Sequence, residues 1–538
     1  MKLKFLLSIM LLFFGGTILF SQNTQDMVPV SSRVYEYLQV LAAQQNKVTI
    51  IIERPASRQK ILGELDKLEY DQLSSSAQAL YQQVLQELKP SPLYTEAGGL
   101  AIDVGMEMNL EGYAEADSEH VRFAVPDTGR RALLKIPLEA WLFDSFYGKF
   151  EMPVKKEPFL YERVPDHGGN WINLPVTMSQ IDYQFPYVAY LNAGGEHWNL
   201  QIGRDVLRYG SGHGGNFLIG DHIPYYSFVR AETFWEGFTF YYSAIDLEPW
   251  DTINPSASGA GDSEFVHKVL FSHGFVFSFI PRLRLSLRES SLLSEFDPSL
   301  NYLNPLMMFH NWYLDSSNSI MTVDAKWNVY KGVNLYSVLA IDQLQTFFEL
   351  QRYDNAATTP NAYGYMLGSE VSVVRERGYW LGNIEWVYTN PWLYIHENAN
   401  ANLLWTGQIR SNVDGTYFKQ LPLGYPDGPD SMNLQGRVSY TRPDRFCASG
   451  GYSFTVQGEQ TVVTPWEKSE AAASLRTPTG TAEFTHTAWT QFAWYPYGLP
   501  LLSEIGTGLS YVYVLNENHT DGADYHDLQL TLHVALEL

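Results

Sequence analysis

The sequence predicts a mainly β protein: a closed antiparallel β-barrel that crosses an outer membrane, preceded by a small α-helical unit. From about Leu100 onward, apolar and polar residues alternate in short stretches between turn-rich segments, as they do in strands with one apolar face. Beyond the N-terminus, no apolar run approaches the ~20 residues that a spanning helix needs. The stretch "DLQLTLHVALEL" (527–538) also alternates, and we expect its edge to pair with an early strand and so close the sheet.

Residues 30–90 form the predicted helical unit. In "SSSAQALYQQVLQELKP", apolar residues recur at helical spacing, serines precede the run and Pro90 follows it, which are the signals of a capped helix and its end. Two earlier stripes repeat the spacing, one from Val34 to Ala42 and one from Ile61 to Leu68. Between them, "KVTIIIERPASR" predicts a short extended segment that ends in a turn. Such a small unit buries little surface alone and is expected to dock on the rest of the chain.

The β region begins near residue 96 and contains clear alternating stretches. The patterns "HWNLQIGR", "GFVFSF", "RLRLSLRES" and "VNLYSVLAIDQ" each place their apolar residues on one face, and Gly-, Pro-, Asn- and Asp-rich clusters separate them. At about 20 to 25 residues per strand with its connection, this region holds roughly 18 to 22 strands.

Two architectures fit these strands: soluble β-sandwiches, or a barrel whose apolar face meets lipid while its polar face lines the lumen. The pattern around Arg282, Arg284 and Arg288 favours the barrel, because three arginines opposite three leucines suit a wet interior. The abundant aromatic residues, with 35 Tyr and 14 Trp, suit the girdles at the two membrane interfaces.

The N-terminus and the composition indicate a secreted, acidic protein. Lys2 and Lys4, an apolar run over 5–20 and Ser21 predict a signal peptide over residues 1–21; the alternative is a retained anchor helix. The single Cys447 excludes a disulfide framework. The formal net charge of −23 opposes binding to nucleic acid.

Four short motifs have chemical interpretations that their contexts disfavour. Gly210–Gly215 matches G-x-G-x-x-G, but no helical pattern follows it. Gly261–Glu264, "GDSE", resembles an esterase nucleophile block but lies in a loop, and no G-x-S-x-G elbow occurs. His396 and Glu397 are adjacent and do not share a strand face, and a tight turn accounts for Asp427 and Asp430. The sequence therefore predicts no catalytic residues, no metal site and no cofactor.

Several stretches together resemble the Wzi-like capsule assembly family of outer-membrane proteins. In chain order they are "RPASRQKILGEL", "IGRDVLRYGSGHGGNFLIGDHIPYYSF", "LNPLMMFH", "NLYSVLAIDQLQ", "IEWVYTNPWLYIHENAN" and "LPLGYPDGPDS". Tyr209 and Ser211 depart from the Trp and Pro expected there. The resemblance implies a barrel of about 18 strands with a periplasmic helical unit that plugs it. The expected parts are a signal peptide (1–21), a helical periplasmic or plug unit (22–95) and a barrel in the bacterial outer membrane (96–538).

The resemblance also implies a non-enzymatic, lectin-like role in holding capsular or other surface polysaccharide. Sugars bind to aromatic faces and to planar polar side chains, and two stretches offer them: Arg204, Asp205 and Arg208, and then Arg230, Glu232 and Trp235. Girdle aromatics and lumen ion pairs are the alternative interpretation of these six residues. The expected partners are surface polysaccharide, outer-membrane lipid and the outer-membrane insertion machinery. The competing functions are a porin or transporter, or a membrane-embedded enzyme.

Overall fold

A computed structural model describes most of the chain after the predicted signal peptide. The described residues are 23–89, 95–97, 99–117, 129–156, 171–183, 185–250, 266–294, 300–312, 317–345, 360–411, 415–443, 445–466, 469–496, 499 and 501–537. The signal peptide, the Gly261–Glu264 stretch and Leu538 lie outside this set.

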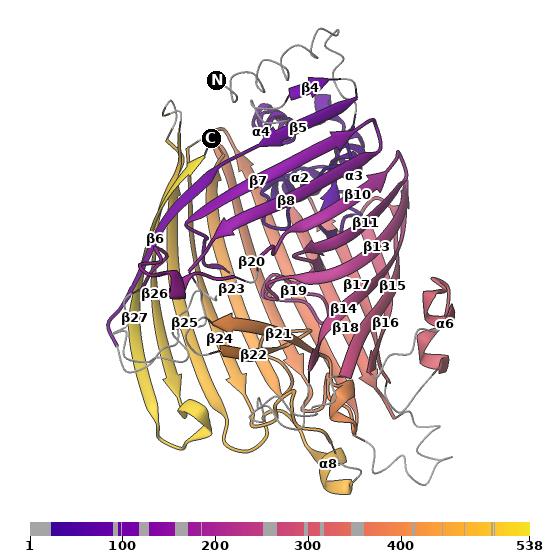
Figure 1. Cartoon of the computed structure of the whole chain (residues 1–538), viewed down its shortest axis with the longest axis vertical. Helices are drawn as coiled ribbons and strands as arrows, with labels where there is room; N and C mark the ends of the chain where they lie inside the picture. The colour runs from indigo at the N-terminus through magenta and orange to yellow at the C-terminus, as the bar shows by residue number, and fades with distance from the viewer. Residues whose placement is uncertain are drawn as a thin grey trace, which may run out of the picture.

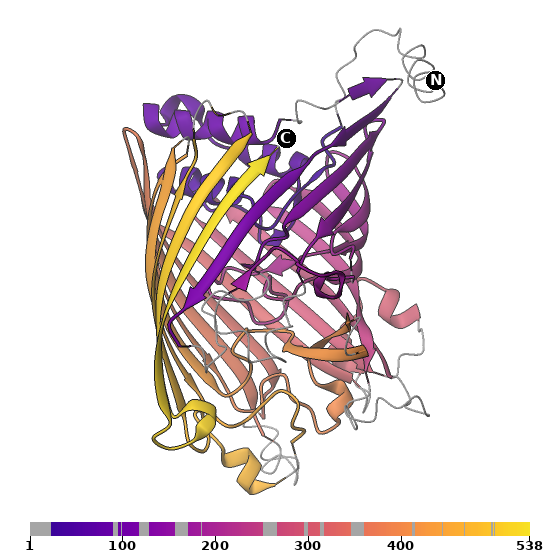
Figure 2. The same ribbon diagram turned by 60° about the vertical axis from the view of Figure 1, so that its left-hand side comes forward.

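Within the described residues, eighteen antiparallel strands form a closed ring (Figures 1 and 2). They are β6 (Glu107–Glu115), β7 (Leu134–Leu142), β8 (Phe146–Val154), β10 (Ala189–Gly194), β11 (Trp198–Asp205), β13 (Tyr226–Trp235), β14 (Phe238–Trp250), β15 (Val266–Ile280), β16 (Leu283–Ser294), β17 (Ser317–Tyr330), β18 (Val333–Gln343), β19 (Ala362–Arg375), β20 (Gly378–Thr389), β23 (Ser431–Arg442), β24 (Phe446–Gln457), β25 (Glu483–Trp494), β26 (Leu502–Leu515) and β27 (Asp524–Glu537). The ring closes where β27 pairs with β6, with Leu530 opposite Ala114. The predicted closure is confirmed, and because the sheet has no second layer, the sandwich alternative is wrong.

Side-chain alternation gives the ring an apolar outside and a polar inside. On β27, Leu528, Leu530 and Leu532 are exposed outward, at 49%, 40% and 54%, whereas Gln529 is buried. On β16, Leu283, Leu285 and Leu287 lie outside, while Arg284 and Arg288 lie inside and Arg282 falls in the preceding turn. An apolar surface this continuous is unfavourable in water, but in a bilayer it meets lipid.

The two ends of the barrel differ in their connections. At one end, two-residue turns join consecutive strands, as at Glu236–Gly237 and Lys331–Gly332, where the glycines have φ +74° and +77°, as hairpin turns require. At the other end, connections such as 206–225, 390–430 and 458–482 are long. We call these the turn end and the loop end; β27 runs toward the turn end (Figures 1 and 2).

Aromatic side chains collect on the outer face near both ends. Near the turn end lie Trp198, Trp235, Trp327 and Trp380, and near the loop end Tyr365 stacks on Tyr388 with ring centroids 5.0 Å apart. These two groups match the predicted interfacial girdles.

Three helices occupy the turn end (Figure 2): α2 (Val34–Gln44), α3 (Arg58–Asp66) and α4 (Ser75–Glu87). Their apolar stripes pack on one another and on Tyr379 of the wall. The Oγ atoms of Ser57 and Ser74 cap α3 and α4 by accepting bonds from the Lys60 and Ala77 amides, which satisfies donors that a helix start leaves free. In the described residues, no helix has the length and apolar character to span a membrane.

The remaining strands and α-helices are not part of the ring of eighteen strands, and α6 and α8 lie outside the barrel (Figure 1). They are β1 (Met27–Val28), β2 (Glu53–Arg54), β3 (Ala56–Ser57), β4 (Thr95–Ala97), β5 (Leu100–Val104), β9 (Trp171–Ile172), β12 (Arg208–Tyr209), β21 (Leu404–Ser411), β22 (Gly415–Pro422), α6 (Leu300–Leu303) and α8 (Glu470–Ser474).

Candidate functional site: the barrel lumen

Two segments far apart in sequence meet inside the barrel. The 206–225 connection folds inward, and its strand β12 pairs with β2 of the N-terminal segment, which places Arg208 opposite Arg54 and Tyr209 opposite Glu53. A backbone bond from the Gly210 N–H to the Ile52 carbonyl (3.2 Å) extends the contact. The N-terminal segment is thus hydrogen-bonded to a loop of the barrel.

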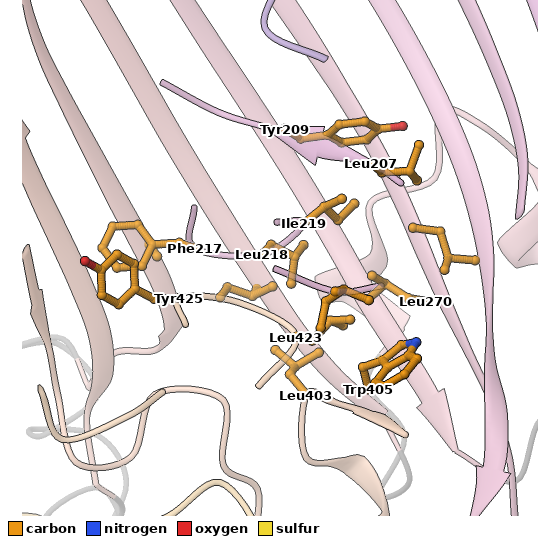
Figure 3. Packing of buried hydrophobic residues seen from close by; sticks show 14 of the residues in the cluster. Leu207, Tyr209, Phe217, Leu218, Ile219, Leu270, Leu403, Trp405, Leu423 and Tyr425 are labelled. Carbon is orange, nitrogen blue, oxygen red and sulfur yellow. The ribbon is translucent and has the colours of Figure 1, made fainter. Parts of the chain in front are cut away.

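An apolar cluster packs around this junction (Figure 3). We call it the lumen core, and its members come from the N-terminal segment, the 206–225 connection, the 390–430 connection and the wall. They include Ile50, Ile52, Leu207, Phe217, Leu218, Ile219, Leu270, Leu403, Trp405, Leu423 and Tyr425, each at most 4% exposed. Burial of this much apolar surface from four parts of the chain holds the inward segments in place.

Buried ion pairs join the N-terminal segment to β13. The Lys60 Nζ lies 2.8 Å from a Glu232 carboxylate oxygen and 4.0 Å from one of Glu53, and Arg230 donates to the Pro55 carbonyl at 2.6 Å. Burial raises the pKa of the Glu53 carboxyl above 4.5, although Lys60 opposes the shift. Two carboxylates therefore share one ammonium group in a dry environment.

Further bonds connect the helical unit to turns around the turn end. The Val48 N–H donates to the Pro281 carbonyl at 2.8 Å, and the Gly332 N–H donates to the Ala43 carbonyl at 2.8 Å. The Tyr379 hydroxyl donates to Glu36 at 2.5 Å. Arg33 donates to the hydroxyl of Tyr495, which directly follows β25.

A polar cavity of about 520 Å³ remains between the N-terminal unit and the wall. Residues 30–54 line one side, and the 208–221 part of the inward connection lines another. Residues of β6, β16, β17, β19, β20 and β23–β27 complete the cavity. Tyr113, Tyr379 and Tyr495 provide aromatic surface. This volume lies within the ~300–1,000 Å³ of pockets that hold small ligands.

The charged lining of this cavity is mainly basic in an acidic protein. The chain has 36 Lys and Arg against 59 Asp and Glu, but seven of the twelve such side chains on the cavity are basic: Arg33, Arg54, Arg131, Arg208, Arg284, Lys326 and Arg437. Their acidic neighbours are Glu36, Glu111, Asp221, Glu370 and Glu504. Planar guanidinium groups beside aromatic rings are the groups that sugars and their acidic substituents need.

The first three predicted carbohydrate contacts lie in different surroundings. Arg208 lines the cavity, where it donates to the Gly212 carbonyl and lies 3.4 Å from Asp221. Arg204 stacks over the Tyr225 ring at 4.1 Å, and Asp205 accepts a bond from the Val206 amide at 2.8 Å.

The other three predicted contacts do not line the cavity. Arg230 and Glu232 point inward and bind Pro55 and Lys60 of the N-terminal segment. Trp235 is 50% exposed on the outer face, where it stacks with Phe238. The structure therefore joins Arg230 and Glu232 to one segment but does not bring the six residues together.

Sequence reasoning missed most of the cavity lining. Arg284 could be placed from the sequence, because the alternation in "RLRLSLR" assigns it to the lumen. Arg33, Arg54 and Arg131 carry no such signal, since each comes from a segment whose position depends on tertiary docking.

The disfavoured motifs have structural roles in the described residues. His213 and Gly214 of the glycine-rich stretch donate their amides to Glu385 at 2.8 and 3.0 Å. Asp430 accepts bonds from the Thr479 and Gln460 amides, both at 3.2 Å. No group of three or more His, Cys, Asp or Glu in the described parts could hold a metal ion. Cys447 lies on the cavity wall, 3.4 Å from the Thr441 hydroxyl.

Comparisons with known proteins give a structural match only. No protein-family model matches the chain, and no curated protein matches it. Wzi of Escherichia coli, an outer-membrane protein involved in group 1 capsule assembly and described as a carbohydrate-binding β-barrel, aligns with a TM-score of 0.57 and 13% identity over 94% of this chain and 98% of Wzi.

Two outer-membrane barrels align less well. The channel DcaP of Acinetobacter baumannii gives a TM-score of 0.37 at 11% identity, over 82% of this chain and 99% of DcaP. OccK3 of Pseudomonas aeruginosa gives 0.40 at 10% identity, over 81% and 95%.

The apolar outer face, the closed ring and the match to Wzi agree with one another. The resemblance first seen in the sequence is confirmed in the fold: this chain is a bacterial outer-membrane β-barrel that shares the fold of the Wzi-like capsule assembly proteins.

Proposed function

We propose that this protein is a non-enzymatic, plugged barrel that binds capsular or other surface polysaccharide and holds it at the cell surface. The observation that carries the proposal is the filled lumen: the lumen core and the docked N-terminal segment occupy the space that a porin leaves to water, and a polar cavity remains beside them. The Wzi fold supports the same function.

The proposal includes an orientation. Outer-membrane barrels have short periplasmic turns and long external loops, so the turn end with its three helices is assigned to the periplasm and the loop end to the outside. Residues 22–95 then form the periplasmic plug unit, residues 96–538 form the barrel, and a signal peptide over 1–21 directs export. The alternating β27 is the segment proposed to engage the insertion machinery.

Of the six predicted carbohydrate contacts, Arg208 has the clearest place in this proposal because it lines the cavity. Arg204 and Asp205 lie on the same strand that leads into the inward connection. Arg230 and Glu232 would contact a sugar directly only after their bonds to Pro55 and Lys60 were broken. Trp235 would contact a sugar only from the outer face of the barrel.

Two measurements test the function. Purified, detergent-solubilised protein should bind polysaccharide extracted from the surface of its own host in a solid-phase assay, and a boiled sample serves as the control. In planar bilayers the full chain should give no sustained open-channel current. A steady current without polysaccharide binding would instead establish a porin or transporter.

A further inference from the structure

The cavity contains an arrangement of arginines that costs stability unless an anion joins it. Arg54 and Arg208 are direct cross-strand partners in the β2–β12 pair, and both line the cavity. Like charges directly opposite in an antiparallel pair repel each other. The β2–β12 pair has only two partner positions, and at one of them both residues carry positive side chains that repel each other.

A third arginine reaches the same place from the wall. Arg284 of β16 is 3% exposed, donates to the Thr49 carbonyl at 3.2 Å and lies 3.3 Å from Asp324. It also donates to the Ser211 hydroxyl. Its Nε has no partner among the described residues. The N-terminal segment, the inward connection and the wall therefore each contribute one guanidinium group to one end of the cavity.

Arg54 is the least compensated of the three. Its guanidinium lies 4.4 Å from the Tyr35 ring centroid, and no carboxylate of the described residues lies within salt-bridge distance of it. Burial and the nearby Arg208 lower the pKa of Arg54 to about 10, so it keeps its charge at neutral pH while the local environment disfavours that charge. A bound anion would relieve this repulsion.

We propose that Arg54, Arg208 and Arg284 form an anion site that binds the carboxylate or phosphate group of an acidic sugar within the luminal cavity. The inference rests on the proposed polysaccharide-binding function and narrows it to acidic polymers. Arginine suits this chemistry because its planar donors match two oxygens of a carboxylate or phosphate. The site is complete only when the N-terminal segment is docked, since that segment supplies Arg54.

The test uses the full mature chain in detergent and isothermal titration calorimetry with trigalacturonate, maltotriose and inorganic phosphate. The natural protein should bind trigalacturonate at low salt, more weakly at high salt, and should bind maltotriose at least tenfold more weakly. Phosphate should compete with trigalacturonate but bind less tightly, because it lacks the sugar. The proposal is overturned if maltotriose binds as tightly as trigalacturonate, or if phosphate does.

Variants locate the site. Arg54→Gln should weaken trigalacturonate binding about tenfold, as expected for loss of one charged hydrogen bond, and Arg54→Lys should restore part of it. Arg377→Gln, in an exposed turn between β19 and β20, is the matched control and should bind like the natural protein. Unchanged affinity in Arg54→Gln overturns the site.

The unfolding temperature distinguishes an anion site from a purely structural role of Arg54. Without ligand, Arg54→Gln should unfold at the same or a higher temperature than the natural protein, because it removes repulsion; a merely structural arginine would give a lower temperature. If the natural protein and Arg54→Gln bind host polysaccharide equally, the anion site fails while the proposed function stands. If the natural protein binds no host polysaccharide, the function fails, and the titration with trigalacturonate still decides the site.

Discussion

At the scale of single residues, buried charged side chains organise the lumen. Lys60 is 2% exposed and Glu232 is 3% exposed, so removing either one leaves the other buried without its partner. Arg230 beside them bonds to a backbone carbonyl. These residues fix the position of the N-terminal segment as directly as the apolar contacts do.

Replacing Lys60 should undock the helical unit. Lys60→Met leaves the Glu232 carboxylate buried without a cation and should cost about 3–5 kcal/mol of docking free energy. Hydrogen exchange of the amides in 34–87 should become much faster. Lys89→Met is the matched control, because Lys89 is exposed just after α4 and no carboxylate of the described residues forms an ion pair with it; it should change exchange little. Equal exchange in both variants would contradict this role for Lys60.

Docking should also depend on pH through Glu53. Because its pKa is raised in the folded protein, the docked state holds the proton more tightly than the undocked state. Docking is therefore strongest in acid and weakens as the pH rises above the ordinary value of 4.5. Exchange of the same amides should be slower at about pH 5 than at about pH 7.5 after correction for intrinsic rates. Glu53→Gln should reduce that difference; an unchanged difference would assign the pH dependence to another group.

The residue scale is also where sequence reasoning reached its limit. The apolar faces of the strands and Arg284 in the lumen follow from period-two alternation, which depends only on neighbouring residues. The opposition of Arg54 and Arg208 depends on two segments more than 150 positions apart entering the same lumen, and no local pattern encodes that meeting. The same holds for Glu232, which was predicted as a sugar contact and pairs with Lys60.

At the scale of elements, each strand divides its side chains between lipid and lumen. The last strand shows the division clearly, with Leu530 outside and Thr531 inside on the cavity wall. Alternation predicted these strands well because the same rule holds in every one of them. Strand β12 and the β21–β22 hairpin, which lie within the ring, were not predicted, since their positions follow from tertiary packing.

A charge on the outer face of β27 should destabilise the barrel. Leu530→Arg places a guanidinium in the lipid-facing middle of the strand and should cost about 2–4 kcal/mol. Thr531→Arg, one position along and facing the lumen, should cost much less. Denaturant titrations of the refolded protein in vesicles measure both; similar destabilisation by the two variants would argue against a lipid-facing Leu530.

At the scale of the whole molecule, a closed wall surrounds a filled interior. The lumen core joins the 206–225 and 390–430 connections to the N-terminal segment, and the helices cover the turn end (Figure 2). The closed barrel and its approximate strand number could be predicted from composition, alternation and family resemblance. The residues that fill the lumen could not be predicted from the sequence, because no local pattern shows which long connections fold inward.

Removing the N-terminal unit should open part of this interior. A chain lacking residues 23–89 loses one wall of the cavity and the partners of β12 and Glu232, so it should conduct ions in planar bilayers where the full chain does not. Lys89→Met in the full chain, at an exposed position, is the control and should stay closed. Heat-dependent gel mobility shows whether the barrel of the deletion variant is folded. If a folded deletion variant does not conduct, the remaining connections seal the lumen without the N-terminal unit.

The bonds of the N-terminal segment also constrain the order of assembly. Asn23 donates to the Phe143 and Phe146 carbonyls, Val48 to Pro281, and Arg33 to Tyr495. These acceptors come from turns spread along the entire chain, and the last is made more than 450 residues after its donor. The stretch that leaves the ribosome early can therefore complete its contacts only after nearly the whole chain has been made.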